Sequence, residues 1–381
     1  MRVVVAPDKF KGSLTAPEVA ARVAAGLTRA APGVEVVQVP VADGGDGTLE
    51  AAVSAGYRRV PVRAEGPTGE PVDTAYAEGD GVAVVELADV SGLHRLPGSR
   101  PAPLTASSYG TGQVIGAALD AGCRRIVLGI GGSAGTDGGA GMVQALGGRL
   151  VDAGDGEVGR GGAALAAVGS LDLAGLHPAL PQAEVVVASD VDNPLLGPRG
   201  AAAVYGPQKG ASPADVVELD AALARWADAV QRATGIDAAG TPGAGAAGGV
   251  GFAALAVLGA RLEPGIDLIL DLVRFREALP GARLVITGEG SLDAQTLHGK
   301  APAGVAAAAR SAGIPVVAVA GRSLLSPAEL EPAGILAAYA LTDLEPDPAR
   351  SMTEAGPLLE RLAARVAIDW VTDDAKETTS R

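Results

Sequence analysis

The stretch RIVLGIGGSAGTDGGAGMVQALGG, residues 125–148, joins an apolar run to an unusually dense group of glycines. Residues 126–128 are typical of a buried strand, and residues 142–146 are typical of a helix. Seven glycines lie from Gly129 to Gly141, where they let the backbone take positive φ and let another group approach the main chain closely. This order of strand, glycine-rich loop and helix predicts an α/β fold.

The same loop offers groups that could bind an anion. A helix that begins at such a loop presents free N–H groups and the positive end of its dipole. Ser133 and Thr136 add hydroxyl groups, and Asp137 adds a carboxylate that could hold a metal ion. Taken alone, the loop is equally compatible with binding phosphate or carboxylate and with a tight turn in any α/β protein.

The composition limits the classes of protein and partner. A chain of 381 residues predicts two domains, and 48% hydrophobic residues with only 3% aromatics predict cores of small aliphatic side chains. The net charge of −14 argues against nucleic acid or an anionic membrane as a partner. An anionic small substrate would need local basic groups.

The cysteine count and hydropathy favour a soluble, cytoplasmic protein. The single cysteine, Cys123, excludes an intramolecular disulfide and fits a reducing compartment. The apolar run at the N-terminus is shorter than the core of a signal peptide, and the longest uncharged apolar stretch, residues 248–260, is too short to span a bilayer.

The order of strands and helices along the chain predicts the domain organisation. Strands and helices alternate before residue 55 and after residue 281, which predicts a parallel sheet. Residues 57–63, 71–77 and 82–87 read as strands joined by turns too short for helices, which predicts an antiparallel meander. We therefore expect a discontinuous α/β domain from residues 1–55 and 281–372, an inserted mixed-sheet α/β domain from residues 56–280, and a disordered tail over 373–381. A cleft between two domains is a favoured place for a ligand.

Five loops that follow predicted strands combine glycine with acids, hydroxyls or lysines. In chain order they contain Asp8, Lys9, Lys11 and Ser13; Asp43 and Asp46; Ser133 and Asp137; Asp190, Asp192 and Asn193; and Glu289, Ser291, Asp293, His298 and Lys300. The last loop, residues 288–300, follows a strand expected over 284–287. Any one loop could equally be a structural turn, but loops at the carboxyl ends of parallel strands gather at the ligand site.

This set of side chains favours phosphoryl transfer. Acids and lysines without a Cys or His cluster favour Mg²⁺ over zinc or iron. Lysines and loop amides neutralise phosphate oxygens, and the transfer also needs a base for the acceptor hydroxyl. The sequence therefore predicts a kinase of a small anionic substrate. It contains neither a GxxxxGK[ST] motif nor the protein-kinase signatures.

Several long motifs together resemble those of a known family. They are APDKFKGSLTAPEVA, ADGGDGT, YGTG with GIGGSAGTDGGAGM, SDVDNPLLGPRGAA, GPQKGA and ITGEGSLDAQTLHGK. In this order they resemble the bacterial glycerate kinase family of the type that forms 2-phosphoglycerate, over roughly residues 1–370. The resemblance implies ATP, Mg²⁺ and D-glycerate as ligands, a discontinuous flavodoxin-like domain, and a second domain resembling restriction endonucleases. It leaves a homodimer open.

The resemblance suggests roles for the loop residues. Lys9 and Lys11 would neutralise the glycerate carboxylate or the transferring phosphate. Asp190 or Asp192 would hold Mg²⁺ or accept the hydroxyl proton, and the sequence does not decide which. The other residues of the five loops would line the substrate and phosphate site, with Ser133 and Asp137 on the phosphates or the metal.

Two positions depart from the family pattern, and two other functions compete. Thr136 stands where an Asn is usual, and Ser291 where a basic residue is common. The charge missing at Ser291 could come from Lys300 or from the lysines of the first loop. A nucleotide-dependent dehydrogenase would need an adenine-ribose fingerprint, and a non-catalytic binding protein for a small hydroxy acid would normally carry a signalling module. Neither feature is visible in the sequence.

Overall fold

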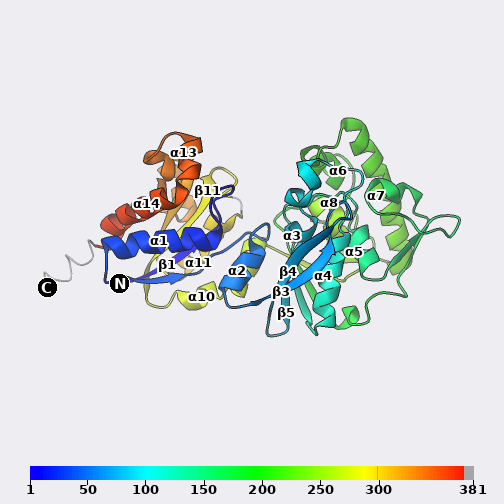
Figure 1. Cartoon of the computed structure of the whole chain (residues 1–381), viewed down its shortest axis with the longest axis horizontal. Helices are drawn as coiled ribbons and strands as arrows, with labels where there is room; N and C mark the ends of the chain where they lie inside the picture. The colour runs from blue at the N-terminus through cyan, green and yellow to red at the C-terminus, as the bar shows by residue number, and fades with distance from the viewer. Residues whose placement is uncertain (298, 373–381) are drawn as a thin grey trace. The chain divides into compact units, whose positions relative to one another are not determined.

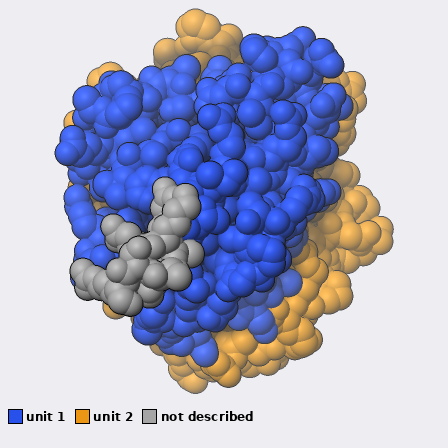
Figure 2. Space-filling view, turned by 90° about the vertical axis from the view of Figure 1, so that its left-hand side faces the viewer, with its two compact units in different colours: residues 1–43, 50–56, 266–381 blue, residues 44–49, 57–265 orange. Residues whose placement is uncertain are grey.

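The computed structural model describes residues 1–297 and 299–372, which form two compact units. Unit 1 contains residues 1–43, 50–56 and those from 266 onward, and unit 2 contains residues 44–49 and 57–265 (Figure 2). Each unit has its own sheet and its own apolar core.

Unit 1 is built on five parallel strands in the order β13-β12-β11-β1-β2. The strands are β1 (Arg2–Pro7), β2 (Glu35–Gln38), β11 (Ala282–Leu292), β12 (Val316–Ser323) and β13 (Ala337–Ala340). This is the strand order of flavodoxin-like folds. The parallel sheet predicted from the alternation of strands and helices is therefore confirmed.

Helices cover both faces of this sheet (Figure 1). Alternate residues of β1 point to opposite faces, so Val3 and Val5 lie in the core beneath α1 (Ala16–Ala30) and α14 (Ala355–Trp370), whereas Val4 lies in the other core. That second core is covered by α9 (Gly265–Leu272), α10 (Phe275–Ala278) and α11 (Ala301–Ser311). Both cores consist largely of Val, Leu and Ala, as the composition predicts.

Local sequence signals fix the start of α1 and its packing. The backbone N–H of Thr15 donates to Glu18 Oε2 at 2.8 Å, and the N–H of Glu18 donates to Thr15 Oγ1 at 3.4 Å. These reciprocal bonds form a capping box. Further along α1, a Cβ at Gly26 would lie 2.2 Å from the carbonyl oxygen of Glu360, so glycine is what lets α14 approach this closely.

Unit 2 contains a six-stranded mixed sheet in the order β10-β9-β6-β5-β4-β3. The strands are β3 (Arg58–Glu65), β4 (Pro71–Gly79), β5 (Val82–Glu86), β6 (Arg125–Gly129), β9 (Glu184–Ala188) and β10 (Arg261–Glu263). Strands β3, β4 and β5 pair antiparallel, as predicted, and the remaining neighbours pair parallel. A separate antiparallel pair joins β7 (Arg149–Val151) to β8 (Ser170–Asp172).

The longer helices of this part of the chain surround a core that contains Trp226. They are α3 (Leu87–Ser91), α4 (Tyr109–Asp120), α5 (Ala140–Ala145), α6 (Ala201–Tyr205), α7 (Pro213–Thr234) and α8 (Ala246–Ala256), whereas α2 (Thr48–Ser54) packs its Ala51 in a core of unit 1. Trp226 on α7 is fully buried and meets Phe252 of α8 edge to face, with 6.5 Å between the ring centroids. No helix among the described residues is both long and apolar enough to cross a bilayer.

Two boundaries differ from the expectations. The expected boundary near residue 280 falls earlier, because Ile266, Ile269 and Phe275 pack in the core of unit 1. The expected loop over 288–300 begins as strand, because β11 stays paired with β12 up to Leu292. At the end of unit 1, Glu354 separates α13 (Pro348–Thr353) from α14. The predicted disordered tail, residues 373–381, lies outside the described residues.

Candidate active site

The topology of unit 1 marks one edge of its sheet for ligand binding. Helix α1 connects β1 to β2 on one face, and α11 connects β11 to β12 on the other. The chain therefore winds in opposite directions from the adjacent strands β1 and β11. In open α/β sheets, ligands bind beyond the carboxyl ends of the strands at such a switch point.

Two buried carboxyl groups lie at this switch point. Pro7 at the end of β1 pairs with Gly288 of β11. The next residues, Asp8 and Glu289, therefore occupy neighbouring positions at the ends of two adjacent strands. Each is only 7% exposed. Burial raises the pKa of Asp8 to about 7 although the nearby Lys9 ammonium lowers it, and burial also raises the pKa of Glu289.

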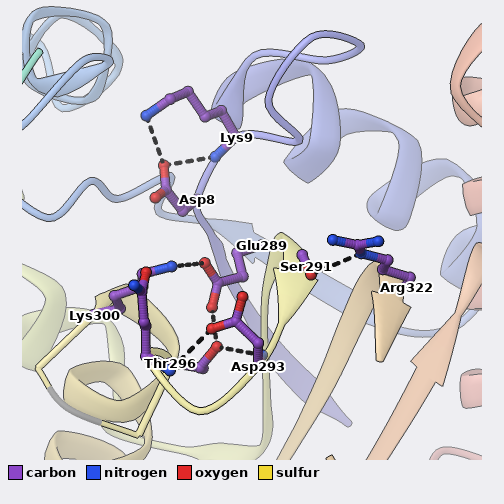
Figure 3. A network of polar contacts seen from close by, with 9 residues as sticks. Asp8, Lys9, Glu289, Ser291, Asp293, Thr296, Lys300 and Arg322 are labelled. Carbon is purple, nitrogen blue, oxygen red and sulfur yellow. Dashed lines mark hydrogen bonds and ion pairs between the residues drawn. The ribbon is translucent and has the colours of Figure 1, made fainter. Parts of the chain in front are cut away.

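Each of these carboxyl groups has a lysine beside it (Figure 3). Asp8 Oδ1 accepts from the backbone N–H of Lys9 at 2.6 Å and lies 3.8 Å from Lys9 Nζ. Glu289 accepts from the hydroxyl of Thr296 and, at 3.4 Å, from Lys300 Nζ. A carboxyl whose pKa is about 7 exchanges protons readily near neutral pH, which suits acid–base chemistry.

The other predicted residues of unit 1 differ in their placement. Asp43 lies close enough to Asp8 to raise the pKa of Asp8 further. Ser13 donates to the carbonyl of Phe10 at 3.1 Å, and Asp293 Oδ1 accepts from the N–H of Gln295 at 2.9 Å, so both stabilise turns. Lys11 is exposed. His298 lies outside the described residues.

In unit 2, the glycine-rich loop is held by Asp137. This carboxylate is 1% exposed and accepts hydrogen bonds from Ser107 Oγ at 3.1 Å and from the N–H and Oγ of Ser108 at 2.7 and 2.9 Å. It also accepts from the N–H groups of Gly139 and Gly141 at 3.1 and 3.3 Å. Its oxygens are therefore engaged by the protein, which favours an anchoring role over direct contact with a ligand.

Lys209 lies beside this loop, and its burial was not predicted from the sequence. Its side chain is 2% exposed, and Nζ donates to Ser133 Oγ at 2.8 Å and to the carbonyl oxygen of Gly135. Burial lowers the pKa of Lys209 to about 7, although the charge of Asp137 raises it. The motif GPQKGA contains this lysine, but nothing in its local spacing shows that the side chain is buried.

Glu86 was also missed, because it ends a strand and carries no glycine motif. It is 5% exposed, and its Oε2 accepts from the N–H groups of Gly47 and Leu49 at 3.1 and 2.9 Å. Burial raises the pKa of Glu86 to about 7, and the charge of Asp46 raises it as well. Glu86 thus fixes the loop that carries Asp46.

The loop after β9 carries the acids predicted to hold a metal ion. Asp190 Oδ1 accepts from the N–H of Gly265 at 2.8 Å. Asp192 has a side chain that is 79% exposed and lies 3.5 Å from Arg199 Nη2. Asn193 accepts from the hydroxyl of Tyr205 at 2.6 Å and donates to the carbonyl of Arg199.

The described residues contain no group of three or more His, Cys, Asp or Glu side chains suited to a metal ion. Mg²⁺ commonly takes only one or two carboxylates and completes its coordination with water and substrate phosphates. The carboxylate oxygens of Asp190 and Asp192 have the chemistry that such a site requires. The donor set therefore fits Mg²⁺ better than a metal that needs a full cage of protein ligands.

Comparisons with known proteins agree with the motifs. The model of the glycerate kinase family matches residues 3–371. The glycerate kinase of Bacillus subtilis is 49% identical over 84% of this chain and 85% of its own length. The glycerate 2-kinase of Escherichia coli is 46% identical over the same shares, 84% and 85%. A crystal structure from Salmonella typhimurium LT2 that carries the glycerate kinase 2 name has 41% identity and a TM-score of 0.85, covering 99% of each chain. The chain is therefore an enzyme that belongs to the glycerate kinase family.

Proposed function

We propose that this enzyme transfers the γ-phosphoryl group of ATP to a hydroxyl of D-glycerate, with Mg²⁺, and forms 2-phosphoglycerate and ADP. Membership in the glycerate kinase family supports glycerate phosphorylation as the reaction. The E. coli relative named glycerate 2-kinase supports the position of the phosphate in the product. The competing functions, a dehydrogenase and a non-catalytic binding protein, do not fit a family of kinases.

The observation that carries the proposal is the carboxyl group of Asp8 at the switch point of the unit 1 sheet. Its pKa of about 7 matches the task of accepting a proton from an alcohol near neutral pH. The acceptor hydroxyl oxygen forms a bond to the γ-phosphorus while the bond to the bridging oxygen of ADP breaks. Asp8 takes the hydroxyl proton. We therefore assign the base to Asp8 rather than to Asp190 or Asp192.

The lysines beside the two acids supply positive charge during the transfer. Lys9 lies next to Asp8, and Lys300 lies next to Glu289. Phosphoryl transfer spreads negative charge over the phosphate oxygens, and fixed cations lower the barrier by stabilising that charge. The Lys9 ammonium also offsets part of the rise in the pKa of Asp8 that burial causes, which favours the ionised form that can act as a base.

Asp190 and Asp192 are the residues we assign to Mg²⁺. When bound, the ion would neutralise charge on the nucleotide phosphates. The exposed carboxylate of Asp192 is free of the dense hydrogen bonding that holds Asp137, so it can bind a hydrated ion without loss of structure. A shared cleft between the two domains, a cytoplasmic location and a homodimer stay predictions.

The test is the release of ADP from ATP and Mg²⁺ with and without D-glycerate. We expect release that depends on glycerate and saturates with its concentration. Phosphorus NMR of the product should show 2-phosphoglycerate. ADP release that is independent of glycerate would contradict the proposed reaction, and 3-phosphoglycerate would contradict the assigned position of the phosphate.

A further inference from the structure

The strands β11 and β12 extend beyond the end of β1. The last residue pair between β1 and β11 is Pro7 with Gly288, whereas β11 and β12 stay paired through Ser291 with Arg322 and Leu292 with Ser323. The two strands thus form a short projecting ribbon directly beyond the switch point. On β11 the ribbon contains Glu289, Ser291 and Leu292.

Three side chains of this ribbon share one face. Residues two apart on a strand point to the same face, and so do register partners on neighbouring strands. Glu289, Ser291 and Arg322 are therefore on one side, as Figure 3 shows with Asp8 nearby. The backbone of Lys11 passes over the other side, because a Cβ at Gly290 would lie 3.1 Å from the Lys11 nitrogen.

The contacts of Arg322 differ from those of its basic neighbours. Arg322 Nε donates to Ser291 Oγ at 3.0 Å, and the side chain is exposed. Within residues 1–297 and 299–372, Arg322 forms no ion pair, whereas Lys9 and Lys300 each lie beside a carboxylate. The hydroxyl of Ser291 thus orients the guanidinium, and its two Nη nitrogens are left for an anion.

We propose that Arg322 binds the carboxylate of the hydroxy-acid substrate. The guanidinium thereby supplies the positive charge that Ser291, on the neighbouring strand, lacks. A guanidinium can bind both oxygens of a carboxylate through two parallel N–H bonds. The acids at this edge, Asp8 and Glu289, repel a triphosphate more strongly than a singly charged glycerate. The inference rests on the proposed function, because it assigns a residue to the acceptor of that reaction.

The first test removes the positive charge of Arg322. R322M should raise the KM for D-glycerate about 10- to 100-fold, the value of a lost charge-assisted bond, and leave the KM for ATP within about twofold. The kcat should change much less than the KM for glycerate. R322K keeps the positive charge but cannot form two parallel N–H bonds to a carboxylate. Its KM for glycerate should therefore lie between those of R322M and the wild type.

The second test moves the charge across the strand pair. Because positions 291 and 322 are register partners, S291R in combination with R322S should recover most of the affinity for glycerate that R322S alone loses. The matched control is R361M, which removes an exposed arginine of α14 in the same unit. R361M should leave both KM values unchanged. Calorimetric titration of each variant with D-glycerate measures the binding without turnover.

The outcomes separate the inference from the proposed function. A wild-type enzyme that releases no ADP with glycerate would contradict the proposed function itself. An active wild type with a KM for glycerate that R322M leaves unchanged would overturn only the role of Arg322. A rise in the KM for ATP instead of glycerate would also overturn it, because the guanidinium would then bind phosphate.

Discussion

The switch-point edge of unit 1 and the glycine-rich loop of unit 2 use the same kinds of residue in opposite ways. Both bring an acid and a lysine to a loop that follows a parallel strand. Asp137 accepts five hydrogen bonds, whereas the Asp8 carboxylate accepts from the backbone N–H of Lys9 and lies beside the Lys9 ammonium. Lys209 is buried against a hydroxyl and a carbonyl, whereas Lys9 lies against a carboxylate.

This difference separates a reactive group from an anchoring group. A carboxylate that accepts several N–H and O–H bonds is stabilised in its charged form, and moving its proton would disturb the loop that it holds. A buried carboxyl with few donors has a raised pKa and can exchange its proton without such a rearrangement. The comparison predicts that substitutions at the edge of unit 1 change turnover, whereas those at the loop of unit 2 change stability.

The largest effect is expected from D8N. Asparagine keeps an Oδ1 that can accept from the N–H of Lys9, but it cannot take the hydroxyl proton. The kcat should fall about 10²- to 10⁴-fold, the usual contribution of a positioned base. The melting temperature should stay close to that of the wild type. ADP release and thermal unfolding measure the two quantities.

The matched control for D8N is D228N, which changes an exposed carboxylate of α7 in the same way. It should leave both quantities unchanged. A D8N enzyme with a kcat within a few-fold of the wild type would remove Asp8 as the base and return that role to Asp190 or Asp192.

The next effect is a loss of stability in D137N. In one orientation, the new NH2 group replaces the oxygen that accepts from Ser107, Ser108 and Gly141. In the other orientation, the NH2 group faces the N–H of Gly139. Since buried donors would lose their acceptor, the free energy of unfolding should fall by about 3 kcal/mol. Urea unfolding measures this change, and D228N is again the control. An unchanged unfolding curve with a large loss of kcat would reverse the comparison and make Asp137 a ligand-binding group.

A smaller effect is the pH dependence of turnover. The base must be deprotonated to act, so kcat/KM should decline about tenfold per pH unit below a midpoint near 7, the pKa of Asp8. In D8N this decline of kcat/KM at low pH should be absent, because asparagine does not titrate. A midpoint near pH 4 in the wild type would show that another group controls the reaction. So would the same decline of kcat/KM below pH 7 in D8N.

The sequence predicted the elements whose signals are local. The strands of the meander depend on the pattern of neighbouring residues and were found where expected, and the Thr15–Glu18 capping box is a local signal of the same kind. The extension of β11 was not predicted, because glycine and serine are typical of loops. Pairing with β12, a distant segment, is what makes these residues a strand.

The site residues were predicted by type but not by role. Asp8 and Asp137 both lie in glycine-containing loops that follow a strand, so the sequence predicted site residues in both loops but did not distinguish their roles. The donors that hold Asp137 include Ser107 and Ser108, about thirty positions earlier in the chain. The burial of Lys209 was not predicted and Arg322 was missed for the same reason, since burial and strand register are set by tertiary structure.

The smallest effect we predict is that of K209M, and its dependence on pH is diagnostic. Methionine fills a similar volume but leaves Ser133 Oγ and the Gly135 carbonyl without their donor, which should cost about 1–2 kcal/mol near neutral pH. The folded pKa of Lys209, about 7, lies below its ordinary 10.5, so above pH 7 the unfolded chain binds the extra proton. The contribution of Lys209 to stability therefore increases as the pH rises from about 7 toward 10.5.

The stability lost in K209M should accordingly be larger at pH 9 than at pH 6. Urea unfolding followed by tryptophan fluorescence measures it directly, because the indole N–H of Trp226 donates to the carbonyl of Gly138 in the glycine-rich loop. A W370F background leaves Trp226 as the single tryptophan and restricts the signal to unit 2. A difference between wild type and K209M that does not vary with pH would mean that Lys209 keeps its ordinary pKa. The buried lysine would then be charged throughout, and Asp137 would be its counter-ion as well as the anchor of the loop.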